Sequence, residues 1–266
     1  MILNYIHWNP KPEIFTIGDW GPRWYGALFA LSFVFGYYLL LKIFKKEGIK
    51  QEVLDSLTIY MFVGTILGAR LGHCLFYQPD YYLQNPLEIL MVWKGGLASH
   101  GGVIGILIAL YLFARKFKKP YIWVLDRLTL VSVMAGFFIR LGNLFNSEIV
   151  GKSTTVKWGF VFERLGEDFA RHPSQLYEAL GYLVIFFILY YAFTKTGGIK
   201  MQGLTAGLYF FLVFVFRFFI EFTKEVQVDF EHGMKLDMGQ WLSIPFIIGG
   251  AALIINSQLQ GKKQKA

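Results

Sequence analysis

The sequence predicts an all-α, polytopic membrane protein with seven transmembrane helices, its N-terminus outside and its C-terminus in the cytoplasm. Of its 266 residues, 55% are hydrophobic and 17% are charged, whereas an average soluble domain has about 25% charged residues. The apolar residues gather in runs of about 20, the length that crosses a bilayer as a helix. Lysine and arginine concentrate in the short segments between alternate runs, which indicates a fixed orientation in the membrane.

The same composition excludes several other classes of protein. The chain is too apolar and too aromatic to be disordered, and its one cysteine, Cys74, excludes a disulfide scaffold. Too few polar residues remain to cover a soluble domain. The net charge of +8 is compatible with nucleic-acid binding. However, the basic residues are sorted along the chain rather than gathered on one face, so we expect no nucleic-acid partner.

The apolar runs define the expected helices. Polar residues and prolines precede the first run, so no secretory signal peptide is evident and we expect this helix to remain in the mature protein. The third run has 18 residues and begins with glycines, and the last is followed by a Lys- and Gln-rich tail. The expected transmembrane segments are 24–41, 57–77, 97–114, 122–142, 177–194, 202–222 and 239–256.

The basic residues set the expected orientation. Thirteen of them lie in short segments with only Glu47 and Glu52 as acids, and the positive-inside rule puts these segments in the cytoplasm. The segments are 42–52, 115–121, 195–201 and the C-terminal tail. The longest connection, 143–176, is then on the outer side, where we expect a small cap within a single membrane domain, 1–266.

Charged residues inside the expected helices need a specific reason. A charge at the centre of a transmembrane helix costs roughly 2.5–3.5 kcal/mol on insertion scales. Arg217 lies in an otherwise apolar run, and Glu221 follows it by four residues. The two side chains either neutralise each other or form an anion clamp in which Glu221 holds Arg217 in place. Arg70, between Gly68 and Gly72, raises the same question.

Two further segments carry polar groups near the outer ends of helices. Arg140, Asn143 and Asn146 recur every three residues and share a sector of one helix, with Glu148 just beyond them. They form either a polar helix end or a phosphate site, since the planar fork of arginine bonds two oxygens at once. His100 lies among glycines, and it is either structural or able to hold a proton near neutral pH.

These observations predict a membrane-embedded site for an anionic lipid or an anionic solute. They do not by themselves choose between catalysis and transport. A transporter or flippase would more naturally show repeats or paired discontinuous helices, and none is evident. A structural membrane protein with internal ion pairs would leave the gathering of charges toward the outer side unexplained. No metal-ligand spacing and no nucleotide-type glycine loop is present, so we expect no metal and no cofactor.

The segment Arg140-Leu-Gly-Asn-Leu-Phe-Asn-Ser-Glu-Ile-Val-Gly151 resembles the signature of the bacterial prolipoprotein diacylglyceryl transferases. The resemblance runs from end to end, with supporting matches at Arg23–Gly26, Gly68–Gly72, Gly95–Gly102, Arg171–Glu178, Phe216–Glu221 and Met238–Gln240. It implies an enzyme that moves a diacylglyceryl group from phosphatidylglycerol to the lipobox cysteine thiol of a preprolipoprotein. The other product is glycerol 1-phosphate, and the reaction belongs at the outer face of the bacterial inner membrane.

The resemblance also implies roles for single residues. Arg140 and Arg217 match two essential arginines and should bind the phosphate. His100 matches an essential histidine, which either helps to deprotonate the thiol or only binds the headgroup. Substrate contacts are expected at Tyr25, Arg70, Asn143, Asn146, Glu148, Gly151 and Glu221, with Glu221 positioning Arg217.

Some features depart from the family pattern. Val213 stands where a tyrosine is frequent, one turn before Arg217, so any hydroxyl contact there is lost or supplied by another residue such as Tyr209. Ser147 stands where glycine is common, and the 143–176 loop is short. Because lipid must enter sideways between helices, we expect the glycine-rich face of 97–114 to form one wall of its path and to tolerate no bulk.

Overall fold

The computed structural model describes residues 5–18, 21–92, 95–196, 201–225 and 233–263. Eight α-helices account for most of them, and two short strands and three 3-10 turns complete the described elements. In chain order these are β1 (Ile6–Trp8), α1 (Trp24–Lys46), α2 (Gln51–Phe76), α3 (Pro79–Gln84), η1 (Pro86–Leu90), α4 (Ser99–Lys116), α5 (Tyr121–Asn146), β2 (Phe160–Phe162), η3 (Glu163–Leu165), α6 (Ser174–Thr196), α7 (Leu204–Ile220), η4 (Glu221–Thr223) and α8 (Met238–Lys263).

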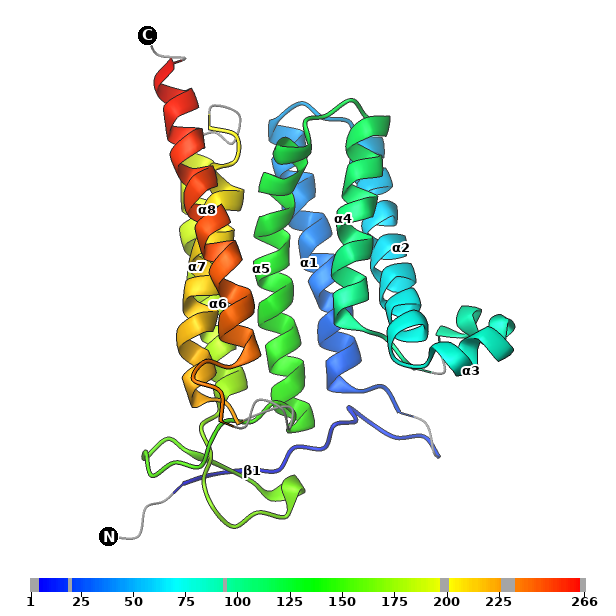
Figure 1. Cartoon of the computed structure of the whole chain (residues 1–266), viewed down its shortest axis with the longest axis vertical. Helices are drawn as coiled ribbons and strands as arrows, with labels where there is room; N and C mark the ends of the chain where they lie inside the picture. The colour runs from blue at the N-terminus through cyan, green and yellow to red at the C-terminus, as the bar shows by residue number, and fades with distance from the viewer. Residues whose placement is uncertain (1–4, 19–20, 93–94, 197–200, 226–232, 264–266) are drawn as a thin grey trace. The chain divides into compact units, whose positions relative to one another are not determined.

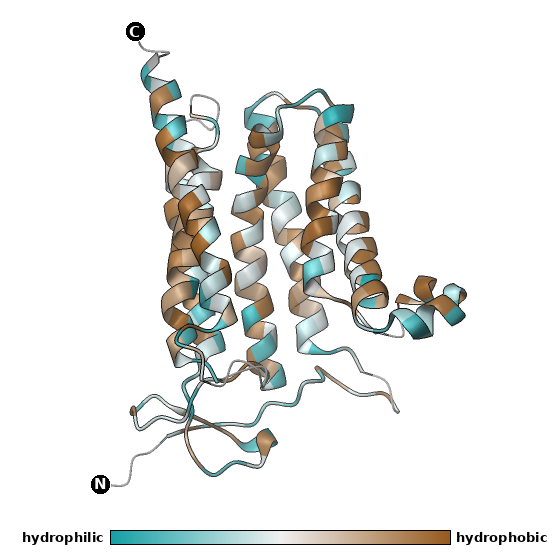
Figure 2. Ribbon diagram, in the orientation of Figure 1, coloured by the Kyte–Doolittle hydropathy of each residue, from teal (hydrophilic) through white to brown (hydrophobic). Residues whose placement is uncertain are grey.

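Six of the described helices, not the seven expected, are long and apolar enough to cross a membrane: α1, α2, α5, α6, α7 with η4, and α8. The expected segment 97–114 corresponds to α4, which has 18 residues. Its first turn contains His100 and two glycines, and its last turn contains Arg115 and Lys116. Figure 2 accordingly shows the middle of α4 as hydrophobic and its ends as polar. The chain is thus an all-α, multi-pass membrane protein.

The chain divides into two compact units, which are described separately below. Unit 1 contains Met1–Gly36 and Asp126–Ala266, and unit 2 contains Tyr37–Leu125. Helices α1 and α5 each contribute to both units. That the chain forms a single membrane domain stays a prediction.

In unit 2, helices α2 and α4 pack against each other along their glycines (Figure 1). A Cβ atom added to Gly101 would lie 2.2 Å from the carbonyl oxygen of Gly68, and one added to Gly105 would lie 2.1 Å from that of Gly64. Small residues allow this close approach of two backbones. The glycine face of α4 is therefore covered by α2, and the expectation that it lines a path for lipid is wrong. Its intolerance of bulk follows instead from helix packing.

In unit 1, helices α6, α7 and α8 lie side by side (Figure 1). The carboxylate of Asp126, near the start of α5, accepts hydrogen bonds from the backbone N–H groups of Gly203 and Ala206, at 2.7 and 2.8 Å. A carboxylate at a helix N-terminus satisfies free N–H groups and complements the helix dipole. These contacts fix one end of α7 against α5, and the candidate site lies at the other end.

The connection from α5 to α6 folds as a small cap together with the N-terminal segment. Strand β1 pairs in parallel with β2, with Ile6 opposite Phe160 and Trp8 opposite Phe162. The Trp8 indole N–H donates to the carbonyl of Leu144 at 2.9 Å, and its ring packs on the buried Phe160. The N-terminal segment is thereby attached to the end of α5 at which the candidate site begins.

Candidate active site

A buried cluster of charged side chains forms where α5 ends, α6 begins and α7 ends. The Arg140 Nε lies 2.8 Å from the Glu178 Oε2, and the Lys224 Nζ lies 3.1 Å from both the Glu178 Oε1 and the Glu221 Oε2. Glu178 is completely buried, and Lys224 is 3% exposed. Buried charges are costly unless they are paired, so each of the two carboxylates balances at least one cation.

A chain of hydrogen bonds continues outward from Arg140. One of its terminal nitrogens donates to the Asn143 Oδ1 at 3.2 Å, and the Asn143 Nδ2 donates to the Glu148 Oε2 at 3.2 Å. The Asn146 Nδ2 donates to the other Glu148 oxygen, also at 3.2 Å. Four of the residues expected from the sequence are thus brought together. The exposed carboxylate of Glu148 is oriented by two amides and connected through one of them to the guanidinium of Arg140.

The backbone around Glu148 takes an uncommon conformation. Ser147 has φ +56° and Ile149 has φ +57°, a region that disfavours residues other than glycine and above all β-branched ones. This explains why glycine suits position 147, where Ser147 departs from the family pattern. The turn is held by the Gln175 amide, which donates to the Glu148 carbonyl at 2.6 Å.

Gly151 lies at the centre of three extended segments. Its N–H donates to the His172 carbonyl on one side, and it bridges Lys224 in antiparallel fashion on the other. A Cβ at this position would lie 2.5 Å from the His172 carbonyl oxygen and from the Ser174 Oγ. These contacts give glycine a packing role here. The expected contact of Gly151 with lipid stays a prediction.

A salt-bridged arginine reinforces this junction from the cap. Arg171 pairs with Glu167 at 2.5 Å and with Glu225 at 2.7 Å, and it donates to the Gly151 carbonyl at 3.1 Å. Its guanidinium holds the pKa of Glu167 below the ordinary value by hydrogen bonding to the carboxylate. The segments that carry Gly151 and Lys224 are therefore joined by side chains as well as by the backbone.

The contacts of Arg217 differ from the expectation. Among the described residues it makes no side-chain hydrogen bond and no ion pair, and Glu221 pairs with Lys224 instead. The Glu221 N–H still donates to the Arg217 carbonyl, so the α-helical spacing between the two residues is kept. The expected Arg217–Glu221 pair is wrong because the Glu221 carboxylate pairs with the Lys224 ammonium, three residues later.

Two tyrosines belong to the helices around the cluster. The Tyr182 hydroxyl of α6 donates to the Glu178 carboxylate at 3.4 Å, and Tyr209 lies two turns before Arg217 on α7. Val213, the departure noted above, is buried and supplies no hydroxyl. Tyr209, one turn earlier on α7, therefore remains the candidate to replace the tyrosine of the family pattern.

Tyr25 joins the same region from α1. A Cβ on Gly142 would lie 2.8 Å from the Tyr25 ring, so the ring packs directly on the backbone of α5. Gly142 lies between Arg140 and Asn143 in the sequence. Tyr25 therefore packs beside this part of α5, whereas its contact with lipid stays a prediction.

The other two expected site residues, Arg70 and His100, belong to unit 2. Arg70 is buried, and its guanidinium donates to the carbonyls of Glu88, Ile89, Gly95 and Gly96 at 2.5, 2.9, 2.5 and 3.2 Å. These bonds fasten the loop between η1 and α4. His100 is exposed in the first turn of α4. That these two residues contact substrate, and that His100 acts beside the arginines, stays a prediction.

The contacts of Arg70 predict a structural effect of its replacement. Arg70→Met should destabilise the protein by at least roughly 1–3 kcal/mol, because several main-chain carbonyls lose their donor together. Thermal unfolding in detergent measures this, with Arg115→Met at the exposed end of α4 as the matched control. An unchanged unfolding temperature with a raised KM for lipid would instead support the substrate contact expected from the sequence.

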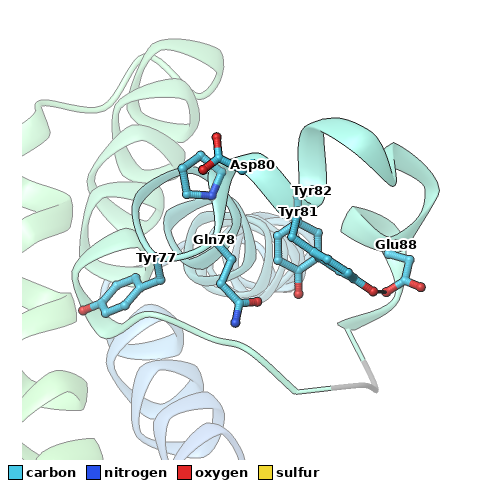
Figure 3. Close-up of a pocket in the computed structure, with 7 residues that line it drawn as sticks. Tyr77, Gln78, Asp80, Tyr81, Tyr82 and Glu88 are labelled. Carbon is cyan, nitrogen blue, oxygen red and sulfur yellow. Dashed lines mark hydrogen bonds between the residues drawn. The ribbon is translucent and has the colours of Figure 1, made fainter.

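One surface pocket of unit 2 is lined by none of the expected site residues. It has a volume of about 570 Å³ and lies where α2 ends and α3 and η1 follow. Figure 3 shows Tyr81 and Tyr82 of α3 beside Glu88 of η1, and the Tyr81 hydroxyl donates to that carboxylate at 3.0 Å.

A metal centre is not indicated either, since no group of three or more His, Cys, Asp or Glu side chains among the described residues is placed to hold an ion.

Sequence reasoning missed two members of the charged cluster, Glu178 and Lys224. Glu178 lies in the matched segment Arg171–Glu178, and Lys224 lies just beyond the apolar run 202–222. Gly239 belongs to the matched segment Met238–Gln240. A Cβ at Gly239 would lie 2.6 Å from the Glu221 carboxyl carbon. Because glycine has no side chain, the Glu221 carboxylate can pack against the first turn of α8. An acidic residue one turn inside an apolar helix was the available signal for Glu178.

Comparison with known proteins identifies, along almost the whole chain, the same family that the signature segment resembles. Residues 12–256 match the family model described as prolipoprotein diacylglyceryl transferase. A phosphatidylglycerol–prolipoprotein diacylglyceryl transferase of Chloroherpeton thalassium is 48% identical over 98% of both chains. Proteins of that name from Tolumonas auensis and Bacteroides fragilis are 47% and 44% identical, covering 95% and 94% of this chain and 97% and 94% of their own. The chain therefore belongs to the prolipoprotein diacylglyceryl transferase family.

Proposed function

We propose that this protein transfers the diacylglyceryl group of phosphatidylglycerol to the lipobox cysteine thiol of a preprolipoprotein. Two observations support this, the names of its relatives and a buried cluster of charged side chains at one end of a membrane bundle. Arg140 belongs to this cluster, and Arg217 lies one helical turn before its Glu221.

The reaction is an attack of the cysteine sulfur on a glycerol carbon of the lipid. A carbon–sulfur bond forms, the carbon–oxygen bond breaks, and its electron pair remains on the departing glycerol 1-phosphate. The phosphate gains negative charge in this step, so cations placed around it stabilise the transition state more than the substrate. Arg140 and Arg217 supply this effect in the proposal.

The thiol must lose its proton during the attack, because a free cysteine has a pKa near ~8.5 and is mostly protonated at neutral pH. We assign the proton to His100, whose side chain is exposed. Tyr25, Asn143 and Glu148 orient the lipid headgroup. Because both substrates are anchored in the bilayer, positioning supplies much of the rate.

We further propose that the cap faces outward, so that the protein acts at the outer face of the inner membrane. The N-terminal segment lies with the cap through β1 and β2, and α8 starts at the same end, where Gly239 meets Glu221. The lysine-rich C-terminal end of α8 then lies on the opposite side. An odd number of crossings is needed, which favours α4 as a seventh crossing in addition to the six longer helices.

A transfer assay tests the function. Purified protein is incubated with phosphatidylglycerol and a lipobox peptide, and the peptide is weighed by mass spectrometry. We expect a gain of one diacylglyceryl unit, no gain with a peptide carrying Cys→Ser, and loss of the gain in the Arg140→Ala variant. Folded, lipid-binding protein that transfers nothing would contradict the proposal and favour transport.

His100→Asn should fold and fail in transfer, and substantial remaining activity would exclude His100 as the base.

A further inference from the structure

Lys224 is a buried cation that the proposed reaction does not yet use. It is 3% exposed and lies between two carboxylates, 3.1 Å from each. The residue follows the 3-10 turn at the end of α7, and the backbone fixes it there through the bridge to Gly151 and the bond from the Lys152 N–H to the Thr223 carbonyl at 2.8 Å. Its ammonium group is thus held in place by contacts outside the helix.

The charges of the cluster do not cancel. The ion-paired groups, Arg140 and Lys224 with Glu178 and Glu221, sum to zero. Arg217, one helical turn before Glu221, adds one positive charge. A phosphodiester carries one negative charge, which matches it. The carboxylate of Glu148 is exposed, so solvent and salt screen its charge.

The ion pairs show which cation remains uncompensated. Glu178 contacts both Arg140 and Lys224, and Glu221 contacts Lys224. Arg217 has no ion pair among the described residues, and its carbonyl accepts a hydrogen bond from the Glu221 N–H at the end of α7. In a site of low dielectric, adding or removing one charge has a large effect on the binding of an anion.

We propose that Lys224 is a positioning residue that sets the charge of the phosphate site: by neutralising Glu178 and Glu221 it leaves Arg217 free to bind the phosphate. This inference rests on the proposed function. Without Lys224, the two arginines and two carboxylates sum to zero, and Glu221 becomes available to pair with Arg217. The site then loses its attraction for an anionic headgroup although both arginines remain.

Four variants, each assayed for the KM for phosphatidylglycerol in mixed micelles, for kcat and for thermal unfolding, test this. Lys224→Met should raise the KM by about tenfold or more, since a tenfold change corresponds to about 1.4 kcal/mol. Lys224→Arg keeps the charge and should retain a KM near that of the wild type. The double variant Lys224→Met with Glu221→Gln restores one net positive charge and should recover most of the lost affinity. Lys152→Met is the matched control, because its side chain is exposed beside the same backbone junction.

The outcomes separate the alternatives. If Lys224 only stabilises the fold, Lys224→Met will unfold at a lower temperature with an unchanged KM for phosphatidylglycerol, and that result would overturn the inference. Failure of Lys224→Arg or of the double variant to recover the KM would also overturn it. If Lys224→Met does not fold, the comparison of the double variant with Lys224→Arg carries the test. Absence of transfer in folded wild-type protein would contradict the proposed function itself, which is a distinguishable result.

Discussion

Arg140→Lys is expected to lower the transfer rate by about a hundredfold or more, the size of effect seen when a preorganised donor to a developing charge is removed. The guanidinium of Arg140 contacts Glu178 through Nε and Asn143 through a terminal nitrogen. A lysine has one compact ammonium group and cannot hold both partners while it also binds a phosphate oxygen. The substitution keeps the positive charge, so the loss of transfer rate measures the contribution of the planar guanidinium geometry.

The other arginine of α5, Arg127, provides the control for this experiment. Arg127 is fully buried and lies over the Phe193 ring, thirteen residues before Arg140 and thus about 20 Å away along the helix. Arg127→Lys should lower the unfolding temperature while the rate per folded molecule stays close to that of the wild type. Transfer by the Arg140→Lys variant at a near-normal rate would show that two-point binding of the phosphate is wrong.

The helices were predictable because hydropathy reports directly on the solvent around a segment. The expected runs 24–41 and 122–142 lie within the helices Trp24–Lys46 and Tyr121–Asn146. The helices extend further because a backbone that is helical in lipid can continue in water for one or two turns, where hydropathy no longer marks it. Hydropathy therefore indicated which part of each helix lies in lipid, and not the residues at which the helix begins and ends. It also missed α3 and η1, which have no long apolar run.

The site was predictable only where its residues are close in sequence. Arg140, Asn143, Asn146 and Glu148 lie within nine positions, and their helical spacing indicated one cluster. The pairing of Glu178 with Lys224 joins residues 46 positions apart, and no local pattern carries it. The pair expected between Arg217 and Glu221 was wrong although the α-helical spacing is kept there. Lys224, which lies beyond the apolar run, pairs with the Glu221 carboxylate instead.

Gly151→Ala is the second substitution for which a large effect is expected. A methyl group there would lie 2.5 Å from the His172 carbonyl oxygen and 2.6 Å from the His172 Cβ, so backbone as well as side chain would have to move. Overpacking of this kind typically costs about 1–3 kcal/mol. The displaced segment also bridges Lys224 and accepts a hydrogen bond from Arg171, so we expect unfolding at a lower temperature together with loss of transfer.

Gly249→Ala is the matched control, because this α8 glycine has open space around the added methyl group and alanine favours a helix. It should leave the unfolding temperature equal or slightly higher and the transfer rate unchanged. The comparison separates two explanations of Gly151. If glycine is needed only so that lipid can approach, Gly151→Ala will raise the KM for phosphatidylglycerol while the protein unfolds at the wild-type temperature. If it is needed for the junction of the three segments, the unfolding temperature must fall, and the ion pairs of Lys224 must weaken with it.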